Sequence, residues 1–274
     1  MLKKFVATAI ILATFTMPAS ADTKDPVVVF AGSASQPPLE EAARVFEEQT
    51  GTRIILHLGG SGAMLSQIRL TGQGDIYIPG SPDYLEKARD FGLVDKAETL
   101  SFLVQAILVP KGNPHNIQQL EDLARPGLRI GMADPDGVCV GLYAVEILDK
   151  SGMTDRVRPN LNGFVESCAK TLAMLPLGMV DAVLGWREFI FWTPDTVDVV
   201  LIDPDIVPRL GYIPAARLEH AENSVGADKF IAFLISDQGR NIFRKWGYYT
   251  DEASVLTLAP NALIGGSYVL PEGW

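Results

Sequence analysis

The chain has 274 residues, of which 47% are hydrophobic and two are cysteines, and its formal net charge is −10 at pH 7. An acidic chain of this kind is not expected to bind nucleic acid, because neutralising phosphates requires clustered lysine and arginine. The length is sufficient for one large domain or two modest domains with substantial hydrophobic cores.

The first 21 residues have the three parts of a secretory signal peptide. Two lysines near the start are followed by a short apolar run, and Ala19-Ser20-Ala21 matches a small-residue cleavage site. The apolar run is shorter than the about 20 residues that a membrane-spanning helix needs. We therefore predict that the protein is exported and that residues 1–21 are removed. Both lysines leave with the signal, so the mature chain has 21 basic and 33 acidic residues and a net charge of −12.

Strand and helix patterns alternate along the first part of the mature chain. Buried strands are predicted at 27–33, 52–59 and 75–81, and amphipathic helices at 39–51, 63–72 and 82–92. In the first helix apolar residues recur at spacings of three and four, and Gly51 is placed to end it. This alternation indicates βαβ units, and hence mostly parallel sheets with helices on both faces.

A second series of elements follows and completes a two-lobed α/β prediction. It consists of a long apolar run at 101–114, a short helix at 117–127, a strand at 128–135, a helix at 141–152, more helix and strand within 172–191, a strand at 197–203 and paired helices within 222–249. In the last pair Phe230, Phe233 and Leu234 share one face. We expect lobe I at about 22–105 together with 216–274, and lobe II at about 106–215.

Small, uncharged residues follow three of the predicted strands. Ser33 and Ser35 follow the first strand, Ser61 lies between glycines after the second, and residues 138–141 follow the strand at 128–135. Ligands of open α/β sheets bind beyond the carboxyl ends of the strands, and helix N-termini there offer donors to an anion without a formal cation. Each loop alone could be a simple turn, but the three together favour an anion site.

Four segments carry a resemblance to a known family. They are "VVVFAGSAS…LEEAARVFEEQTG", "GGSGAMLSQIRLTGQGDIYIPGS", "ADPDGVCVGLYAVEIL" and "KFIAFLISDQGRNIFRKWGY". In matching order, and over nearly all of the mature chain, they resemble the periplasmic molybdate/tungstate-binding components of ABC importers. The resemblance implies a type II periplasmic binding protein whose two lobes close around a tetrahedral oxyanion. It places oxyanion contacts at Ser33 or its neighbours, at Ser61, at the Val140 backbone and at the residue in position 168.

The resemblance also sets the expectations for location, partners and chemistry. We expect a periplasmic monomer with a small-molecule oxyanion ligand, and an ABC transporter permease or a membrane sensor as its partner. No catalytic residue, resident metal or cofactor is expected, since the three histidines are isolated and lack metal-ligand spacing.

The chain departs from the family pattern at the predicted ligand loops. Cys139 stands where the pattern has proline, and Cys168 stands where an ordinary apolar residue offers its amide. The tyrosine expected near 184–186 is absent, and this region contains Trp186 and Arg187. By the resemblance, both cysteines lie in the ligand cleft.

Three hypotheses account for the two cysteines. The first is a structural disulfide in an exported protein. The second is a pair of thiolates, each with its pKa lowered by a helix N-terminus, that binds an arsenite-like oxyanion or a soft metal ion. The third is a redox-gated form of the first. A disulfide here would sit in an open cleft and would be reducible.

Two further features have competing interpretations. Arg187 is the one cation that we place near the ligand, because a buried anion gains from a charge-assisted partner, although a surface salt bridge is also possible. The aromatic stretch that begins at Trp186 could be core, interface or cleft wall. The "GGSGA" stretch around Ser61 is a near miss for the nucleophile elbow of a secreted serine hydrolase, because it lacks the second glycine of that motif.

Overall fold

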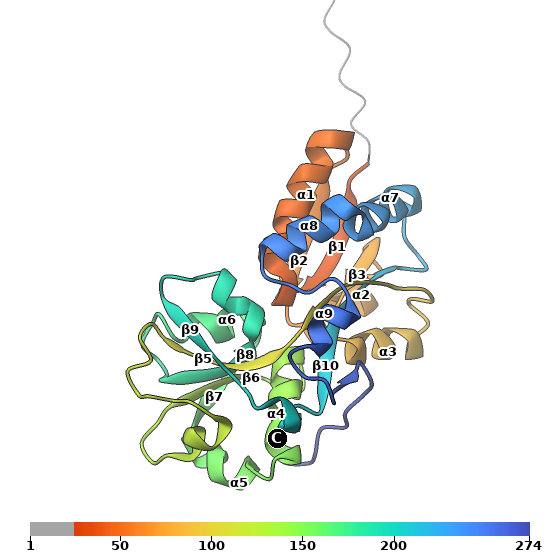
Figure 1. Cartoon of the computed structure of the whole chain (residues 1–274). Coiled ribbons are helices and arrows are strands. Elements are labelled where there is room, and N and C mark those ends of the chain that lie inside the picture. The colour runs from red at the N-terminus through yellow and green to blue at the C-terminus, as the bar shows by residue number, and fades with distance from the viewer. Residues whose placement is uncertain (1–24) are drawn as a thin grey trace, which may run out of the picture.

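The computed structural model describes residues 25–274, which form two lobes, each built on one sheet (Figure 1). The predicted signal peptide at 1–21 lies outside the described residues. The first sheet contains β1 (Val27–Gly32), β2 (Ile54–Gly59), β3 (Ile76–Ile78), β4 (Glu98–Leu103), β10 (Arg209–Arg217) and β11 (Leu263–Ile264). The second sheet contains β5 (Gln105–Pro110), β6 (Ile130–Ala133), β7 (Leu161–Val165), β8 (Ala182–Trp186) and β9 (Val197–Leu201). We call the lobe of the first sheet lobe I and the lobe of the second sheet lobe II.

The sheets are mixed, although the strands linked by helices are parallel as expected. In lobe I, β1 pairs in parallel with β2 and β3, whereas β10 runs antiparallel to β3 and β4. In lobe II, β6 is parallel to β7 and β8, whereas β5 is antiparallel to β8 and β9. These antiparallel pairings all involve β5 or β10, the two strands at which the chain passes from one lobe to the other.

The helices of lobe I form where apolar residues recur at helical spacing. They are α1 (Gln36–Thr50), α2 (Ser61–Thr71), α3 (Pro82–Asp90), α7 (Ser224–Ile235), α8 (Asp237–Lys245) and α9 (Glu252–Leu256), with the short 3₁₀ helix η1 (Ser33–Ser35) before α1. The predicted apolar face of α1 is buried, and Gly51 ends the helix with φ of +70°, a left-handed conformation that glycine adopts without strain. The Phe46 ring packs 5.1 Å from that of Phe230, which joins α1 to the paired helices α7 and α8.

Lobe II has shorter helices and more 3₁₀ turns. They are η2 (Leu120–Ala124), α4 (Cys139–Lys150), α5 (Thr154–Val157), η3 (Arg158–Asn160), α6 (Cys168–Ala173), η4 (Arg187–Phe191) and η5 (Pro204–Ile206). The helix α4 is buried along almost its whole length and packs against β6 and β8. Lobe II thus presents the starts of α4 and α6 towards lobe I.

The long apolar run predicted at 101–114 is divided between the two sheets. Its first part is β4 in lobe I and its second part is β5 in lobe II, with Val104 between them. The chain returns through β10, which is hydrogen-bonded to β4 from Gly211 to Ala215. The two segments that connect the lobes therefore lie side by side.

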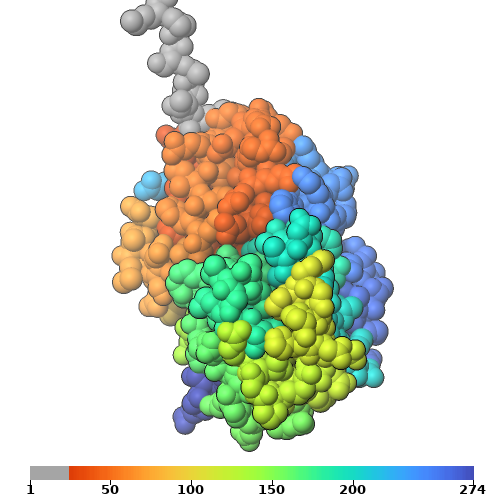
Figure 2. Space-filling model, turned by 90° about the vertical axis from the view of Figure 1, so that its left-hand side faces the viewer, coloured from red at the N-terminus to blue at the C-terminus, as the bar shows by residue number. Residues whose placement is uncertain are grey.

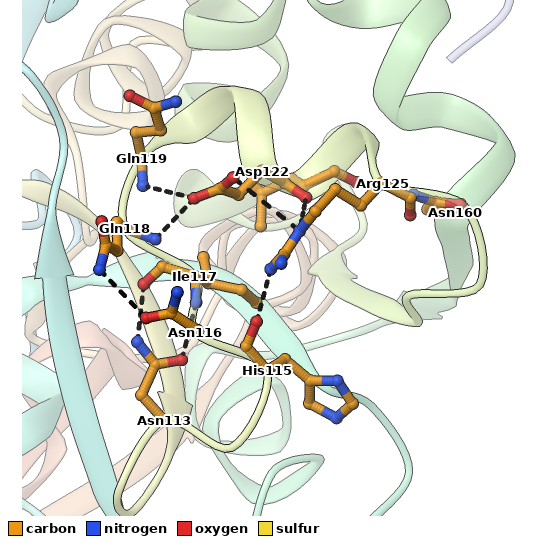
Figure 3. Close-up of polar contacts among 10 residues, drawn as sticks. Asn113, His115, Asn116, Ile117, Gln118, Gln119, Asp122, Arg125 and Asn160 are labelled. Atoms are coloured by element: carbon orange, nitrogen blue, oxygen red, sulfur yellow. Dashed lines mark hydrogen bonds and ion pairs between the residues drawn. The ribbon is translucent and has the colours of Figure 1, made fainter.

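The short helix predicted at 117–127 is present only as the 3₁₀ helix η2, and polar side chains hold the chain before it and cap its start (Figure 3). The Asp122 carboxylate accepts the backbone N–H groups of Gln118 and Gln119 at 2.7 and 3.2 Å. Pro126 favours an extended conformation in the residue before it, and Arg125 has ψ of 130°. Only the 3₁₀ helix η2 remains.

The two lobes are in direct contact along the face shown in Figure 2. The Gly62 backbone N–H of lobe I donates to the Gly137 carbonyl of lobe II at 2.9 Å, and the Tyr84 hydroxyl donates to the Asp136 carbonyl at 2.9 Å. These contacts describe a closed arrangement. Within residues 25–274, none of the helices combines the length and apolar character needed to cross a membrane.

Candidate functional site

The first two candidate residues, Ser33 and Ser35, form the η1 turn at the end of β1. Both are buried, with 3% and 0% of their surface exposed. Neither hydroxyl oxygen has a hydrogen-bond partner within the described part of the chain. The turn lies against α6 of lobe II. A buried hydroxyl without a partner is costly, so these two groups are suited to a partner that a ligand supplies.

Ser61 begins α2 at the same edge of the sheet. Its Oγ accepts the backbone N–H of Gly80 at 3.0 Å. A Cβ atom placed on Gly32 would lie 2.7 Å from this oxygen and 2.7 Å from the Gly80 nitrogen. The ends of β1 and β3 therefore come together around Ser61 only because both neighbouring residues lack side chains.

Cys139 and Cys168 lie next to each other at the first positions of α4 and α6. Their Sγ atoms are 3.9 Å apart, and both are free thiols with 1% of the residue surface exposed. A Cβ atom on Gly80 would lie 2.5 Å from the Cys139 sulfur and 3.6 Å from Ser61 Oγ. The thiols of lobe II thus face the Ser61 loop of lobe I, across the interface between the lobes.

The environment of Cys168 corrects the expectation of a lowered pKa. Burial raises the pKa of the Cys168 thiol well above its ordinary value, and the neighbouring Cys139 raises it further. The Val140 backbone N–H and the Trp186 side chain oppose this rise in pKa but do not reverse it. The expected open cleft is likewise wrong for this closed arrangement, because both thiols are inaccessible to solvent. Cys168 is therefore a neutral thiol here.

Val140 and Trp186 enclose the thiol pair within lobe II. Both residues are fully buried. The Trp186 ring packs edge-on against Tyr143 with centroids 5.0 Å apart. Its indole N–H makes no hydrogen bond of regular geometry with the described residues, so its interaction with Cys168 is a loose one. Of the three interpretations of the aromatic stretch, a buried wall beside the thiols describes Trp186 best.

Arg187 makes its contacts with the segment after α8 and with η4. Its guanidinium donates to the Gly247 carbonyl at 2.9 Å and lies 3.4 Å from the buried Glu188 carboxylate. It also stacks over the rings of Phe191 and Tyr249 at 5.4 and 5.0 Å. Arg187 therefore joins η4 of lobe II to the end of α8 in lobe I. Its ion pair with the buried Glu188 is not a surface salt bridge, and its contact with the ligand stays a prediction.

A buried ion-pair network joins the two lobes, and no sequence pattern predicted it. Arg209 of β10 lies 3.0 Å from Asp83 of α3 and 2.5 Å from Glu146 of α4, and all three side chains are less than 10% exposed. Its guanidinium also donates to the Tyr143 hydroxyl at 3.0 Å. Nothing in the sequence pairs these charges, which are 63 and 126 positions apart.

Glu188 and Tyr248 also lie close to the site and were not predicted. The Tyr248 hydroxyl donates to the Ala34 carbonyl at 2.5 Å, which attaches the segment after α8 to the η1 turn. Burial raises the pKa of Glu188 to about 7, against the opposing effects of Arg187 and of backbone N–H groups. The sequence signal available was the position of Glu188, next to Arg187, within an aromatic stretch.

The comparison with known sequences settles the family. The profile of the bacterial extracellular solute-binding proteins matches residues 27–249. The chain belongs to this family. It is similar to a binding protein of Haemophilus influenzae, with 26% identity over 92% of this chain and 98% of the relative. It is also similar to the molybdate-binding protein ModA of Escherichia coli, with 24% identity over 81% of this chain and 88% of the relative.

Solved structures show the same fold. The periplasmic molybdate-binding protein of Azotobacter vinelandii matches with a TM-score of 0.74 and 17% identity, over 82% of this chain and 100% of that chain. Peb3 of Campylobacter jejuni matches with a TM-score of 0.66 and 24% identity over the same shares. The expected type II periplasmic binding fold and the resemblance to the molybdate-binding family are confirmed.

The family also sets the broad role of the chain. Its members are periplasmic or lipoprotein solute-binding components of ABC importers, which implies a small-molecule ligand and a membrane permease. They are binding proteins rather than enzymes. The serine-hydrolase alternative for Ser61 is therefore not taken further.

Proposed function

We propose that this solute-binding protein captures a small tetrahedral oxyanion, of the molybdate or tungstate type, between its two lobes. The observation that carries the proposal is the pair of buried hydroxyl groups of Ser33 and Ser35, which have no partner among residues 25–274, in a turn that lies against the opposite lobe. The curated relatives that carry the name molybdate-binding protein give the proposal its ligand class.

The proposed donors are neutral groups from both lobes. Ser61 lies at the start of the 11-residue helix α2, and Val140 is the second residue of the 12-residue helix α4. Helix N-termini favour anions through their free N–H groups and the helix dipole. Such a site needs no cation, and the Arg187 guanidinium already has a partner in the Gly247 carbonyl. We assign Ser33, Ser35, Ser61 and the Val140 backbone to the oxyanion.

The movement that admits the ligand is a separation of the lobes. We propose that the chain passes between them at Val104 and just before Arg209, because β10 is hydrogen-bonded to β4 of lobe I along most of its length. The second lobe then ends near residue 208 instead of 215. We further propose that the protein is an exported monomer in the periplasm, and that it delivers its ligand to an ABC permease.

Calorimetry with molybdate, tungstate, sulfate and phosphate tests the proposal. Wild-type protein should bind at least one of them, and small-angle scattering should show a smaller radius of gyration with that ligand. Loss of one donor to an anion costs about 1.5–3 kcal/mol, so Ser61→Ala should bind about tenfold to a hundredfold more weakly. Ser66→Ala, which alters an exposed serine of the same helix, is the matched control. Unchanged affinity in Ser61→Ala would show that the site lies elsewhere.

A further inference from the structure

We propose that Cys139 and Cys168 form a dithiol site for a trivalent arsenic oxyacid, the neutral acid of arsenite. The proposal rests on the function above, because it requires a ligand held between the lobes. It adds a ligand class that the serine and amide donors do not define. Both thiols are free, and both belong to the closed interface between the lobes.

The spacing of the two sulfur atoms suits one shared central atom. Trivalent arsenic is pyramidal, and two sulfurs bonded to it at about 2.3 Å with bond angles of roughly 90–110° lie roughly 3.3 to 3.8 Å apart. The observed separation of 3.9 Å is just above this range. A small rotation of the side chains therefore brings both sulfurs to one atom.

The charge of the site favours a neutral acid over a metal cation. Each thiol replaces one hydroxyl of the acid: an As–S bond forms, an As–O bond breaks, and the thiol proton leaves with the hydroxyl as water. Two such steps give a dithiolate with one remaining As–OH group and two waters, with no change in oxidation state or net charge. A metal cation instead requires thiolate anions, whereas burial raises the pKa of the Cys168 thiol.

The surroundings of the thiols agree with this choice. Within residues 25–274 no cluster of three or more histidine, cysteine or acidic side chains could hold a metal ion. The guanidinium of Arg187 donates to the Gly247 carbonyl. Arg187 therefore does not require a negatively charged ligand as its partner. Ser61 Oγ and the Cys139 sulfur lie around the same Gly80 position, within reach of an As–OH group.

Arsenite binding to the reduced protein tests the dithiol site. The protein is reduced with a phosphine, which is then removed under nitrogen, because small dithiols would compete for arsenic. Wild-type protein should retain one arsenic per chain through gel filtration. Loss of the second, intramolecular bond should lower affinity by about 10²–10⁴ in Cys139→Ser and in Cys168→Ser, with Ser66→Ala unchanged. Arsenite affinity that is unchanged in either cysteine variant overturns the proposal.

A second measurement needs no variant, in case a substitution prevents folding. X-ray absorption at the arsenic edge of the wild-type complex should show two sulfur neighbours, and a shell of oxygen alone overturns the proposal. Reduced protein that takes up no arsenic also overturns it, and the two thiols then serve only as buried core side chains. If such protein still binds molybdate or sulfate and Ser61→Ala weakens that binding, only the dithiol proposal fails. Binding of no oxyanion of any kind, with no change in radius of gyration, refutes the proposed function itself.

Discussion

The buried carboxyl group of Glu188 should make the stability of this protein depend on pH. The side chain is 0% exposed, and burial raises its pKa from the ordinary 4.5 to about 7. Arg187, 3.4 Å away, and the Val104 backbone N–H at 3.3 Å lower the pKa but do not offset burial. Between pH 4.5 and about 7 the folded protein therefore holds a proton that the unfolded chain releases.

The direction and size of the effect follow from this difference. Because the folded pKa is the higher one, the contribution is fully present below about pH 4.5 and is lost as pH rises through about 7. The gap between the two pKa values corresponds to about 3 kcal/mol of unfolding free energy. Glu188→Gln keeps an oxygen for the Val104 N–H but has no proton to release, so it should not show this loss.

Urea denaturation of both proteins between pH 4.5 and 8.5 measures the effect. The difference in unfolding free energy between wild type and Glu188→Gln should change by about 3 kcal/mol across this range, in the direction that favours the variant at high pH. Glu252→Gln, at an exposed position in α9, controls for the loss of one acidic residue. Parallel pH profiles for wild type and Glu188→Gln would refute the assignment of a raised pKa to this carboxyl group.

Two further substitutions test the closed interface. Arg209→Met leaves Asp83 and Glu146 buried without their cation, which should cost about 3–5 kcal/mol of unfolding free energy and increase the radius of gyration. The control is Arg217→Met, at an exposed ion pair, which should cost about 0–1 kcal/mol. Equal melting temperatures for the two variants would contradict the role of Arg209. Gly80→Ala adds a methyl group whose ideal Cβ position is 2.5 Å from the Cys139 sulfur. The affinity for the oxyanion should therefore fall at least tenfold. Gly137→Ala, whose nearest neighbour would be 3.4 Å away, should bind as wild type does, and equal affinities of the two glycine variants would show that the lobes close differently.

Elements with their own periodic signal could be predicted from the sequence. The apolar face of α1 and its end at Gly51 depend on residues within one helix and its cap, and both are as expected. The alternation of strands and helices likewise implied the α/β fold, because each amphipathic element must bury its apolar face against another. The positions of Ser33 and Ser61 after strands followed from the same local order. In contrast, the helix expected at 117–127 is reduced to the 3₁₀ helix η2, because the capping box of Gln119 and Asp122 starts it at Leu120 and Pro126 favours an extended Arg125.

Only the tertiary structure decided the contacts that join distant parts of the chain. Cys139 and Cys168 are 29 positions apart, and the sequence could suggest their proximity only through a family resemblance, whereas folding sets their 3.9 Å separation and the burial that raises the pKa of Cys168. The partner of the Arg187 guanidinium is the Gly247 carbonyl, 60 positions away, which no local pattern indicates. Burial and charge pairing depend on which surfaces meet when the lobes close. A local sequence pattern determines the elements that form, but it contains no information about which side chains face each other across that interface.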